Sequence, residues 1–118
     1  MKVSGQRWEY QIGNTNIIFE NAWSWRGYSQ ERVRVNDEII KDRQGWFWLI
    51  WSKSEVATFK ILDQEYAVII GVQYTDADYN IYSRIITETE VFEPQSFIEA
   101  KWDTKAYLWP PEPDLLST

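Results

Sequence analysis

The sequence contains no cysteine and no histidine among its 118 residues. Without cysteine the chain can form no disulfide framework, no thiol nucleophile, no zinc ribbon and no thiolate-held iron–sulfur cluster. Without histidine it has no Ser-His-Asp triad, no imidazole base near neutral pH and no ordinary zinc or haem site. Carboxylate, Lys, Tyr, Ser and Thr chemistry remains, as does a hard cation bound by oxygen atoms. We therefore expect a protein that is not an enzyme and that uses no cofactor.

Long apolar runs are also missing from the sequence. No stretch of about 18 apolar residues occurs, so we expect no membrane-spanning helix. The N-terminal residues 1–7 are not followed by the apolar core of a signal peptide. We expect a cytoplasmic protein without a membrane partner, although a chain without cysteine folds in either redox environment.

Aromatic residues are abundant, with 8 Trp, 7 Tyr and 5 Phe making up 17% of the chain. Together with 44% hydrophobic and 25% charged residues, this composition is that of one globular domain. It excludes a low-complexity chain and an unfolded acidic chain. We predict a single β domain over residues 1–109. The Pro-rich tail over 110–118 is expected to be extended and mobile, because proline cannot pair in a sheet interior.

The hydrophobic pattern has a period of two over most of the chain, which is typical of β-strands. Turn residues separate the strands, with Asn36-Asp37 and Asp63-Gln64 at the tips of two tight hairpins. The pattern predicts an all-β fold, an antiparallel β-sandwich or flattened barrel of about eight strands. The elements are expected at 7–12, 17–25, 31–42, 46–51, 58–73, 81–92 and 102–109, with at most one short helix near 96–101.

Four short segments share a pattern of paired strands and turns, and they lie at 17–20, 34–40, 59–61 and 66–70. Through them, residues 17–92 resemble one repeat of the Fas apoptotic inhibitory molecule (FAIM-like) family. The resemblance implies a small β-sandwich without an established catalytic site that acts as an interaction or chaperone-like module. The sequence departs from the family pattern by having Asp37 where glycine is favoured and by carrying one repeat unit instead of two. No functional residue is carried over.

A polar segment at 76–80 begins like a calcium-binding loop, because Asp76, Asp78 and Asn80 alternate as oxygen ligands do in such loops. The rest of the pattern is missing, since Ile81 stands where the loop needs glycine and Thr87 where it needs glutamate. The alternative is a solvated turn between two strands, which needs no metal.

Two carboxylates, Glu88 and Glu90, are two residues apart in the predicted strand 81–92 and would share one face of it. Such a pair could hold a cation or act as acid and base, provided that an apolar site raised the pKa of one member. The alternative is a pair of carboxylates on a solvated face, because neither is visibly enclosed.

Tryptophans gather in two segments and are the main candidates for a ligand site or an interface. Alternate residues of a strand share a face, and aromatic platforms of this kind stack on sugars, nucleobases or apolar ligands, or form protein interfaces. The alternative is burial in the core, but twenty large aromatics exceed what one small core readily hides. The candidates are Trp23, Trp25, Trp46, Trp48 and Trp51.

Charge is distributed unevenly along the chain. Residues 1–60 carry a net charge of +2 and residues 61–118 a net charge of −8, within a total of −6. The acidic half argues against nucleic-acid binding, because phosphate attraction needs a basic surface. It would suit docking on a basic partner, and the alternative is that the charge only maintains solubility.

These observations favour a non-enzymatic protein-interaction module that self-associates as a homodimer through aromatic-rich strands at 46–51. The first alternative is a β-barrel that binds a small ligand or carbohydrate through exposed tryptophans. The second is an acidic inhibitor or immunity-type protein that binds a basic enzyme.

Overall fold

The computed structural model describes residues 2–24, 27–46 and 54–103. All regular structure in these residues is β-strand, which confirms the predicted all-β class. In the described part of the chain nine strands form two antiparallel sheets, of five and four strands, in agreement with the eight or so strands that the sequence predicts. The sheets belong to two compact units of the chain, which are described separately. No helix able to span a membrane is found in these residues.

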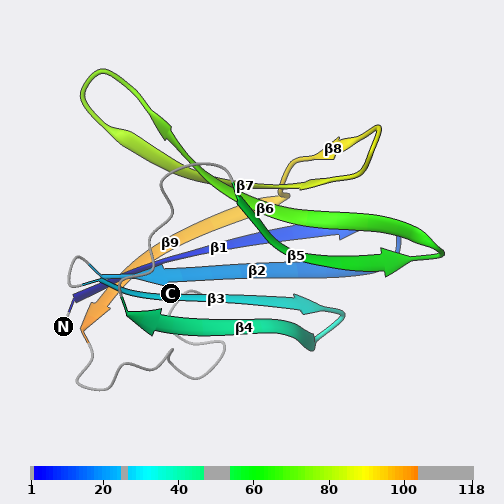
Figure 1. Ribbon diagram of the computed structural model, residues 1–118, viewed down its shortest axis with the longest axis horizontal. Coiled ribbons are helices and arrows are strands. Elements are labelled where there is room, and N and C mark those ends of the chain that lie inside the picture. The colour runs from blue at the N-terminus through cyan, green and yellow to red at the C-terminus, as the bar shows by residue number, and fades with distance from the viewer. Residues whose placement is uncertain (1, 25–26, 47–53, 104–118) are drawn as a thin grey trace. The chain divides into compact units, whose positions relative to one another are not determined.

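The first unit contains a five-stranded sheet in the order β4–β3–β2–β1–β9 (Figure 1). The strands β1 (Lys2–Ile12), β2 (Thr15–Trp23), β3 (Tyr28–Val35) and β4 (Glu38–Trp46) follow one another as a meander. The last described strand, β9 (Ser96–Asp103), pairs antiparallel with β1. The sheet therefore joins the two ends of the described chain, and β9 and β4 are its edges.

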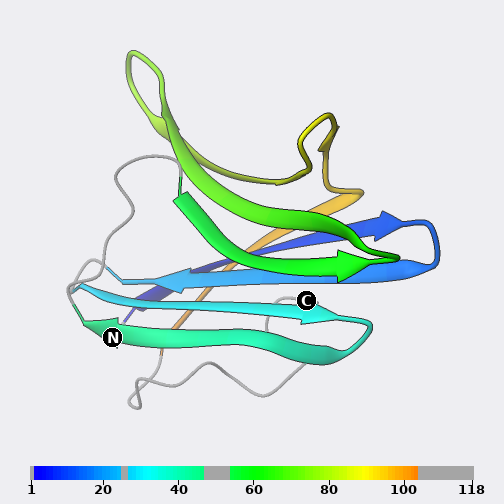
Figure 2. The ribbon, with the colours of Figure 1, turned by 45° about the vertical axis from the view of Figure 1, so that its right-hand side comes forward.

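The second unit contains a four-stranded sheet in the order β5–β6–β7–β8. The strands are β5 (Ser54–Ile61), β6 (Gln64–Tyr74), β7 (Tyr79–Ile86) and the short β8 (Val91–Phe92). Each pairs with the next along the chain, and the hairpin of β5 and β6 curves along its length (Figure 2). This unit is a meander of local pairings.

The predicted hairpin turn at Asn36-Asp37 is confirmed, and both residues have the positive φ angles (47° and 68°) that a two-residue turn requires. The second hairpin turns one residue earlier than predicted, at Leu62-Asp63 instead of Asp63-Gln64. This register sets Phe59 opposite Tyr66, and their rings stack at 5.4 Å. The same register places Leu62 in the turn, where its side chain is 96% exposed.

One face of the five-stranded sheet, here called the core face, carries the large apolar side chains of the first unit. The Trp8 ring stacks on Phe19 across the strand pair at 5.2 Å and lies 5.5 Å from the ring of Phe97 on β9. The alternation predicted for this part of the chain is thus seen in the structure. The fully or almost fully buried apolar side chains on this face include Trp8, Tyr10, Ile17, Phe19 and Val33.

Two expected elements are wrong. The segment 96–101 is the greater part of strand β9, not a short helix, because it pairs with β1 in an unbroken register. Its helix-forming residues are overridden by this tertiary pairing. The expected strand 81–92 is interrupted after β7 by a turn. Of the expected strand 102–109, only 102–103 are described, as the end of β9, and the tail 110–118 lies outside the described residues.

Candidate functional site

The structure describes two of the five candidate tryptophans. Trp23 is half-buried at the end of β2, and Trp46 is the last residue of β4. They pair with Ser29 and Tyr28 of β3, so both lie at the same end of the five-stranded sheet. The other candidates, Trp25, Trp48 and Trp51, lie outside the described residues.

Glu88 and Glu90 lie in the turn that joins β7 to β8, and not on one strand as expected. The backbone amide of Thr87 donates to the carbonyl oxygen of Glu90 at 2.9 Å, and the Thr87 hydroxyl accepts the Glu90 amide at 3.0 Å. This turn ends β7, and both carboxylates are exposed on it. The shared strand face on which the acid–base interpretation depended is therefore absent.

Asp76 and Asp78 lie in the turn between β6 and β7, and Asn80 is the second residue of β7. The backbone amide of Thr75 donates to the carbonyl oxygen of Asp78 at 2.8 Å, and Asp78 Oδ1 accepts the amide of Tyr79 at 2.8 Å. The segment thus has the geometry of a hydrogen-bonded hairpin turn. Among the described residues, no group of three or more Asp or Glu side chains is arranged to hold a metal ion.

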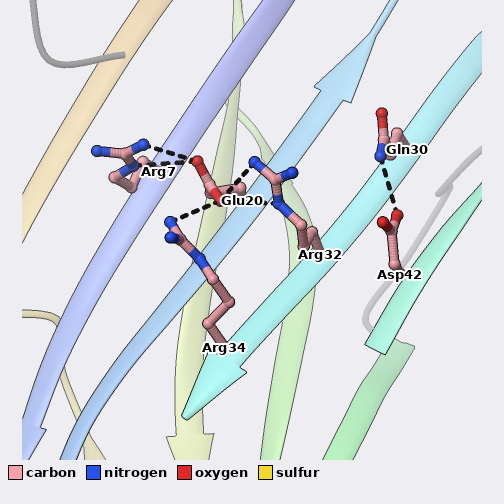
Figure 3. Close-up of polar contacts among 6 residues, drawn as sticks. All are labelled: Arg7, Glu20, Gln30, Arg32, Arg34 and Asp42. Carbon is pink, nitrogen blue, oxygen red and sulfur yellow. Dashed lines mark hydrogen bonds and ion pairs between the residues drawn. The ribbon is translucent and has the colours of Figure 1, made fainter. Parts of the chain in front are cut away.

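The most concentrated group of charges lies on the face of the five-stranded sheet opposite the core face, here called the arginine face (Figure 3). Glu20, in the central strand β2, is fully buried there. Its cross-strand neighbours are Arg7 on β1 and Arg32 on β3, and Arg34 follows Arg32 on the same face. Three guanidinium groups therefore converge on one carboxylate.

The three arginines use both oxygens of Glu20. Arg7 donates to Oε2 through Nε at 3.1 Å and Nη2 at 2.8 Å. Arg32 Nε and Arg34 Nη2 donate to Oε1 at 3.1 and 3.0 Å. Charge-assisted bonds of this kind are roughly twice as strong as neutral ones, and the arginine side chains are only 11–14% exposed. The cluster holds β1, β2 and β3 together through their charged side chains.

Asp42 on β4 extends this row to the edge of the sheet. It lies opposite Arg32 and accepts a hydrogen bond from Gln30 Nε2 at 2.9 Å (Figure 3). Positive and negative residues therefore alternate across four neighbouring strands, from Arg7 through Glu20 and Arg32 to Asp42. Opposite charges that face each other across strands stabilise a sheet.

A second polar row crosses the core face of the same sheet, and its members are directly opposite one another on all five strands. Each strand contributes one residue to this row, here called the relay row. From the edge β9 to the edge β4, its members are Glu99, Gln6, Asn21, Glu31 and Arg43. The three inner side chains, Gln6, Asn21 and Glu31, are almost completely buried.

The two amides of the relay row donate in one direction, toward β9. Asn21 Nδ2 donates to Gln6 Oε1 at 3.2 Å, and Gln6 Nε2 donates to Glu99 Oε2 at 3.2 Å. At the other end, Arg43 Nη2 donates to Glu31 Oε1 at 2.6 Å. The two hydrogen-bonded segments meet between Asn21 and Glu31.

Asn21 Oδ1 and Glu31 Oε2 are buried oxygen atoms without a hydrogen-bond donor among the described residues. The nitrogen of the Asn21 amide points toward β1, so its oxygen is turned toward β3, where Glu31 lies directly opposite. Two buried acceptors without donors therefore belong to residues that are directly opposite each other in this strand pair. Buried polar atoms are nearly always hydrogen-bonded, and a proton on Glu31 would supply the missing donor.

Burial raises the pKa of Glu31 to about 7, against the opposing effect of the cations of Arg43 and Lys41. The carboxyl group therefore keeps its proton well above the ordinary value of 4.5. A protonated Glu31 can donate to Asn21 Oδ1, which completes the hydrogen bonds of the relay row. The site thus has the chemistry to bind and release one proton near neutral pH.

The two edges of this sheet differ. In β4, Ile40 is an extra residue where the pairing with β3 shifts between Val33 and Arg34, and such a bulge bends an edge away from further pairing. In contrast, β9 pairs eight consecutive residues with β1 without a shift. It exposes 49% of Phe97 and 37% of Ile98, which point to opposite faces. Among the described residues no strand pairs with the outer side of β9, so it has the features of an edge to which another strand can add.

Sequence reasoning singled out no member of either polar row. The signal for two pairs was available, because the turn at Gly13 sets Ile12 opposite Thr15 and so places Arg7 opposite Glu20 and Gln6 opposite Asn21. The pairs between β3 and β4 depend on the bulge that follows the turn at Asn36-Asp37. The remaining pairs depend on the longer connection between β2 and β3 and on β9, whose register the sequence does not specify.

Comparisons with models of protein families, with curated proteins and with solved structures found no match for this chain. The proposals that follow therefore rest on the residues, contacts and charges of the chain itself.

Proposed function

We propose that this protein is a non-enzymatic interaction module that associates with a second copy of itself through the outer edge of β9. The observation that carries the proposal is the contrast between the bulged edge β4 and the regular edge β9. A regular edge strand presents backbone N–H and C=O groups to which another strand can add. The absence of cysteine and histidine supports a role without catalysis.

The charges of β9 favour a second copy as the partner. An antiparallel pair of β9 strands centred on Ala100 would set Glu99 of one copy opposite Lys101 of the other. Two-fold symmetry repeats this pair, so the interface contains two ion pairs of opposite charge. Moving the two-fold centre by one residue, from Ala100 to Glu99, would set the two Glu99 side chains against each other. The self-complementary register is therefore also the favoured one.

Apolar groups at the same edge add to the case. Phe97 and Ile98 are exposed large side chains that flank the proposed pairing on its two faces. Strand pairing in a dimer would shield part of each from water, at about 25 cal/mol per Å² of apolar surface. The self-association that the sequence places at 46–51 lies, apart from Trp46, outside the described residues.

Charge reversal at β9 tests the proposal by sedimentation velocity over a range of protein concentrations. In the symmetric pair, Lys101→Glu sets a negative charge opposite the negative Glu99 of the other copy. Glu99→Lys sets a positive charge opposite the positive Lys101 of the other copy. We expect the wild type to form dimers and each variant alone to be monomeric. An equal mixture of the two variants should form dimers, because both ion pairs are then restored in the mixed pair.

The matched control is Lys60→Glu, which reverses an exposed charge on β5 in the other unit and should leave dimer formation unchanged. A wild type that stays monomeric at all concentrations contradicts the proposal. So does a mixture of the two β9 variants that remains monomeric while the wild type forms dimers, because pairing at β9 predicts the rescue.

A further inference from the structure

We propose that the relay row is a proton-controlled switch: loss of the Glu31 proton reverses the hydrogen bonds of Asn21 and Gln6 and releases Glu99 for pairing at the β9 edge. This inference rests on the proposed function, because the pairing of Glu99 with Lys101 of a second copy is what the switch would regulate. The relay itself is a property of one chain.

The relay row is directional. Each of its amides has its nitrogen on one side and its oxygen on the other, so a chain of two amides donates either toward β9 or toward β3. In the structure both nitrogens point toward β9, and Glu99 receives the last N–H group. Glu31 receives none of these N–H groups and faces the oxygen of Asn21.

The observed direction of the relay row requires a proton on Glu31. With the proton, the Glu31 hydroxyl donates to Asn21 Oδ1, and every inner member of the row has a donor facing an acceptor. Without it, the charged Oε2 of Glu31 faces the Asn21 oxygen in a buried site. Leaving buried polar groups unsatisfied, or setting two acceptors against each other, is unfavourable and opposes this arrangement.

Turning both amides over gives the ionised Glu31 and the Asn21 oxygen a hydrogen-bond donor each. The Asn21 nitrogen then donates to the ionised Glu31, and the Gln6 nitrogen donates to the Asn21 oxygen. Gln6 now presents its oxygen to Glu99 and no longer binds that carboxylate. The proton leaves to solvent at the β4 end of the row, where the Arg43 side chain is 46% exposed. The hydrogen bond of 3.1 Å from Gln6 Nε2 to Ser4 Oγ is also broken, and the Ser4 hydroxyl can then donate to the Gln6 oxygen instead.

The groups that face Glu31 are two cations on one side and neutral side chains on the others. The cations that face it come from the edge strand β4, and their attraction is outweighed by burial. From β2 it is faced by a neutral amide, and its neighbours on the same face of β3 are neutral, whereas the adjacent Arg32 lies on the arginine face. The next carboxylate of the row is three strands away. In order, these groups are Arg43 and Lys41 on β4, Asn21 on β2, Ser29 and Val33 on β3, and Glu99 on β9.

The consequence is a linkage between proton release and self-association. With Glu31 protonated, Gln6 holds Glu99 over the surface of β1, and in the reversed row Glu99 is available to Lys101 of a second copy. Association should therefore be tighter above neutral pH than below it. By reciprocity, dimer formation should lower the pKa of Glu31 by the corresponding amount.

The relay is tested on the monomer by NMR, at a concentration below that at which dimers form. The carboxyl carbon of Glu31 and the side-chain amide of Gln6 are followed from about pH 5 to pH 9. In the wild type both signals should change with one midpoint near pH 7. In Glu31→Gln, whose amide can donate to Asn21 at every pH, the Gln6 signal should not change. The control Glu65→Gln, at an exposed residue of β6, should behave as the wild type.

The regulation is tested by sedimentation at pH 6 and pH 8. The dissociation constant of the wild-type dimer should be about fivefold lower at pH 8 than at pH 6, which is the lower end of usual coupling strengths. That of Glu31→Gln should have the same dissociation constant at both pH values. A Glu31 signal that titrates near the ordinary value for glutamate, or a Gln6 signal that does not follow it, overturns the relay and leaves the proposed dimer intact.

Two further outcomes separate this inference from the proposed function. If the wild type forms dimers with the same affinity at both pH values, the regulation is wrong although the dimer is right. If the NMR titration is as expected but the wild type is monomeric at every pH, the proposed function is wrong and the relay has no dimer to regulate.

Discussion

Two glutamates of the same sheet, Glu20 and Glu31, are both fully buried, yet their surroundings differ. Glu20 lies on the arginine face of β2, with three guanidinium groups at 2.8–3.1 Å. Glu31 lies on the core face of β3, with a single guanidinium on one oxygen and an acceptor facing the other. Burial alone therefore does not decide what a carboxyl group does in this protein.

The difference lies in the number of donors that replace water. Removing a carboxylate from water is costly, and hydrogen bonds from cations can offset that cost. At Glu20 the protein supplies them from two neighbouring strands, so the carboxylate acts as a fixed link between strands. At Glu31 the supply is incomplete, and a proton takes the place of the missing donor. One site is a structural support, and the other has the properties of a switch.

The largest expected effect comes from removing the charge at Glu20. Glu20→Gln should lower the free energy of unfolding by about 3–5 kcal/mol, because it takes the shared carboxylate away from three mostly buried guanidinium groups. Urea unfolding at pH 7 measures the change. The control is Glu93→Gln, which removes an exposed ion pair with Arg84 and should cost at most about 1 kcal/mol. Equal costs for the two variants would break the comparison.

The second effect is a pH dependence that belongs to Glu31. Its pKa is about 7 in the folded protein and 4.5 as the ordinary value, so the unfolded chain releases this proton first as the pH rises. The folded state then binds more protons, and stability falls between about pH 4.5 and pH 7 and levels off above. The free energy of unfolding should fall by about 3 kcal/mol in total, because the pKa difference between 4.5 and about 7 is worth 1.36 kcal/mol per unit.

Glu31→Gln isolates this contribution from those of the other carboxylates. The free energy of unfolding of the wild type, relative to that of the variant, should fall with rising pH over this window and stay constant above it. Urea unfolding at half-unit pH steps measures the difference. Parallel curves for the two proteins would mean that Glu31 titrates alike in the folded and unfolded states.

Features that depend on neighbours in sequence could be predicted. The turn at Asn36-Asp37 follows from two residues that tolerate positive φ, and the alternation in β2 follows from the pattern of its side chains. The class of the fold needed no more than this. The turn at Leu62-Asp63 shows the limit, because a stacked ring pair moved it by one residue.

Features that depend on distant strands could not be predicted. The segment 96–101 contains good helix formers, and only its pairing with β1 makes it a strand. The hydrogen bond between Gln6 and Glu99 joins residues 93 positions apart. Glu31 becomes unusual only when Asn21 and Arg43 are brought to its two sides. Both polar rows are thus products of register across the whole sheet, which no single segment encodes.

The smallest effect concerns the one cation that binds Glu31. Arg43→Gln removes a charge that lowers the pKa of Glu31, so the midpoint of the pH-dependent step should move above pH 7. The shift should stay below about one unit, because Arg43 is 46% exposed and ion pairs of that kind contribute about 0.2–1 kcal/mol. The same urea series measures it. A midpoint that moves down would mean that Arg43 acts on Glu31 mainly by burying it, and Glu31 would then differ from Glu20 in solvent access instead of in its donors.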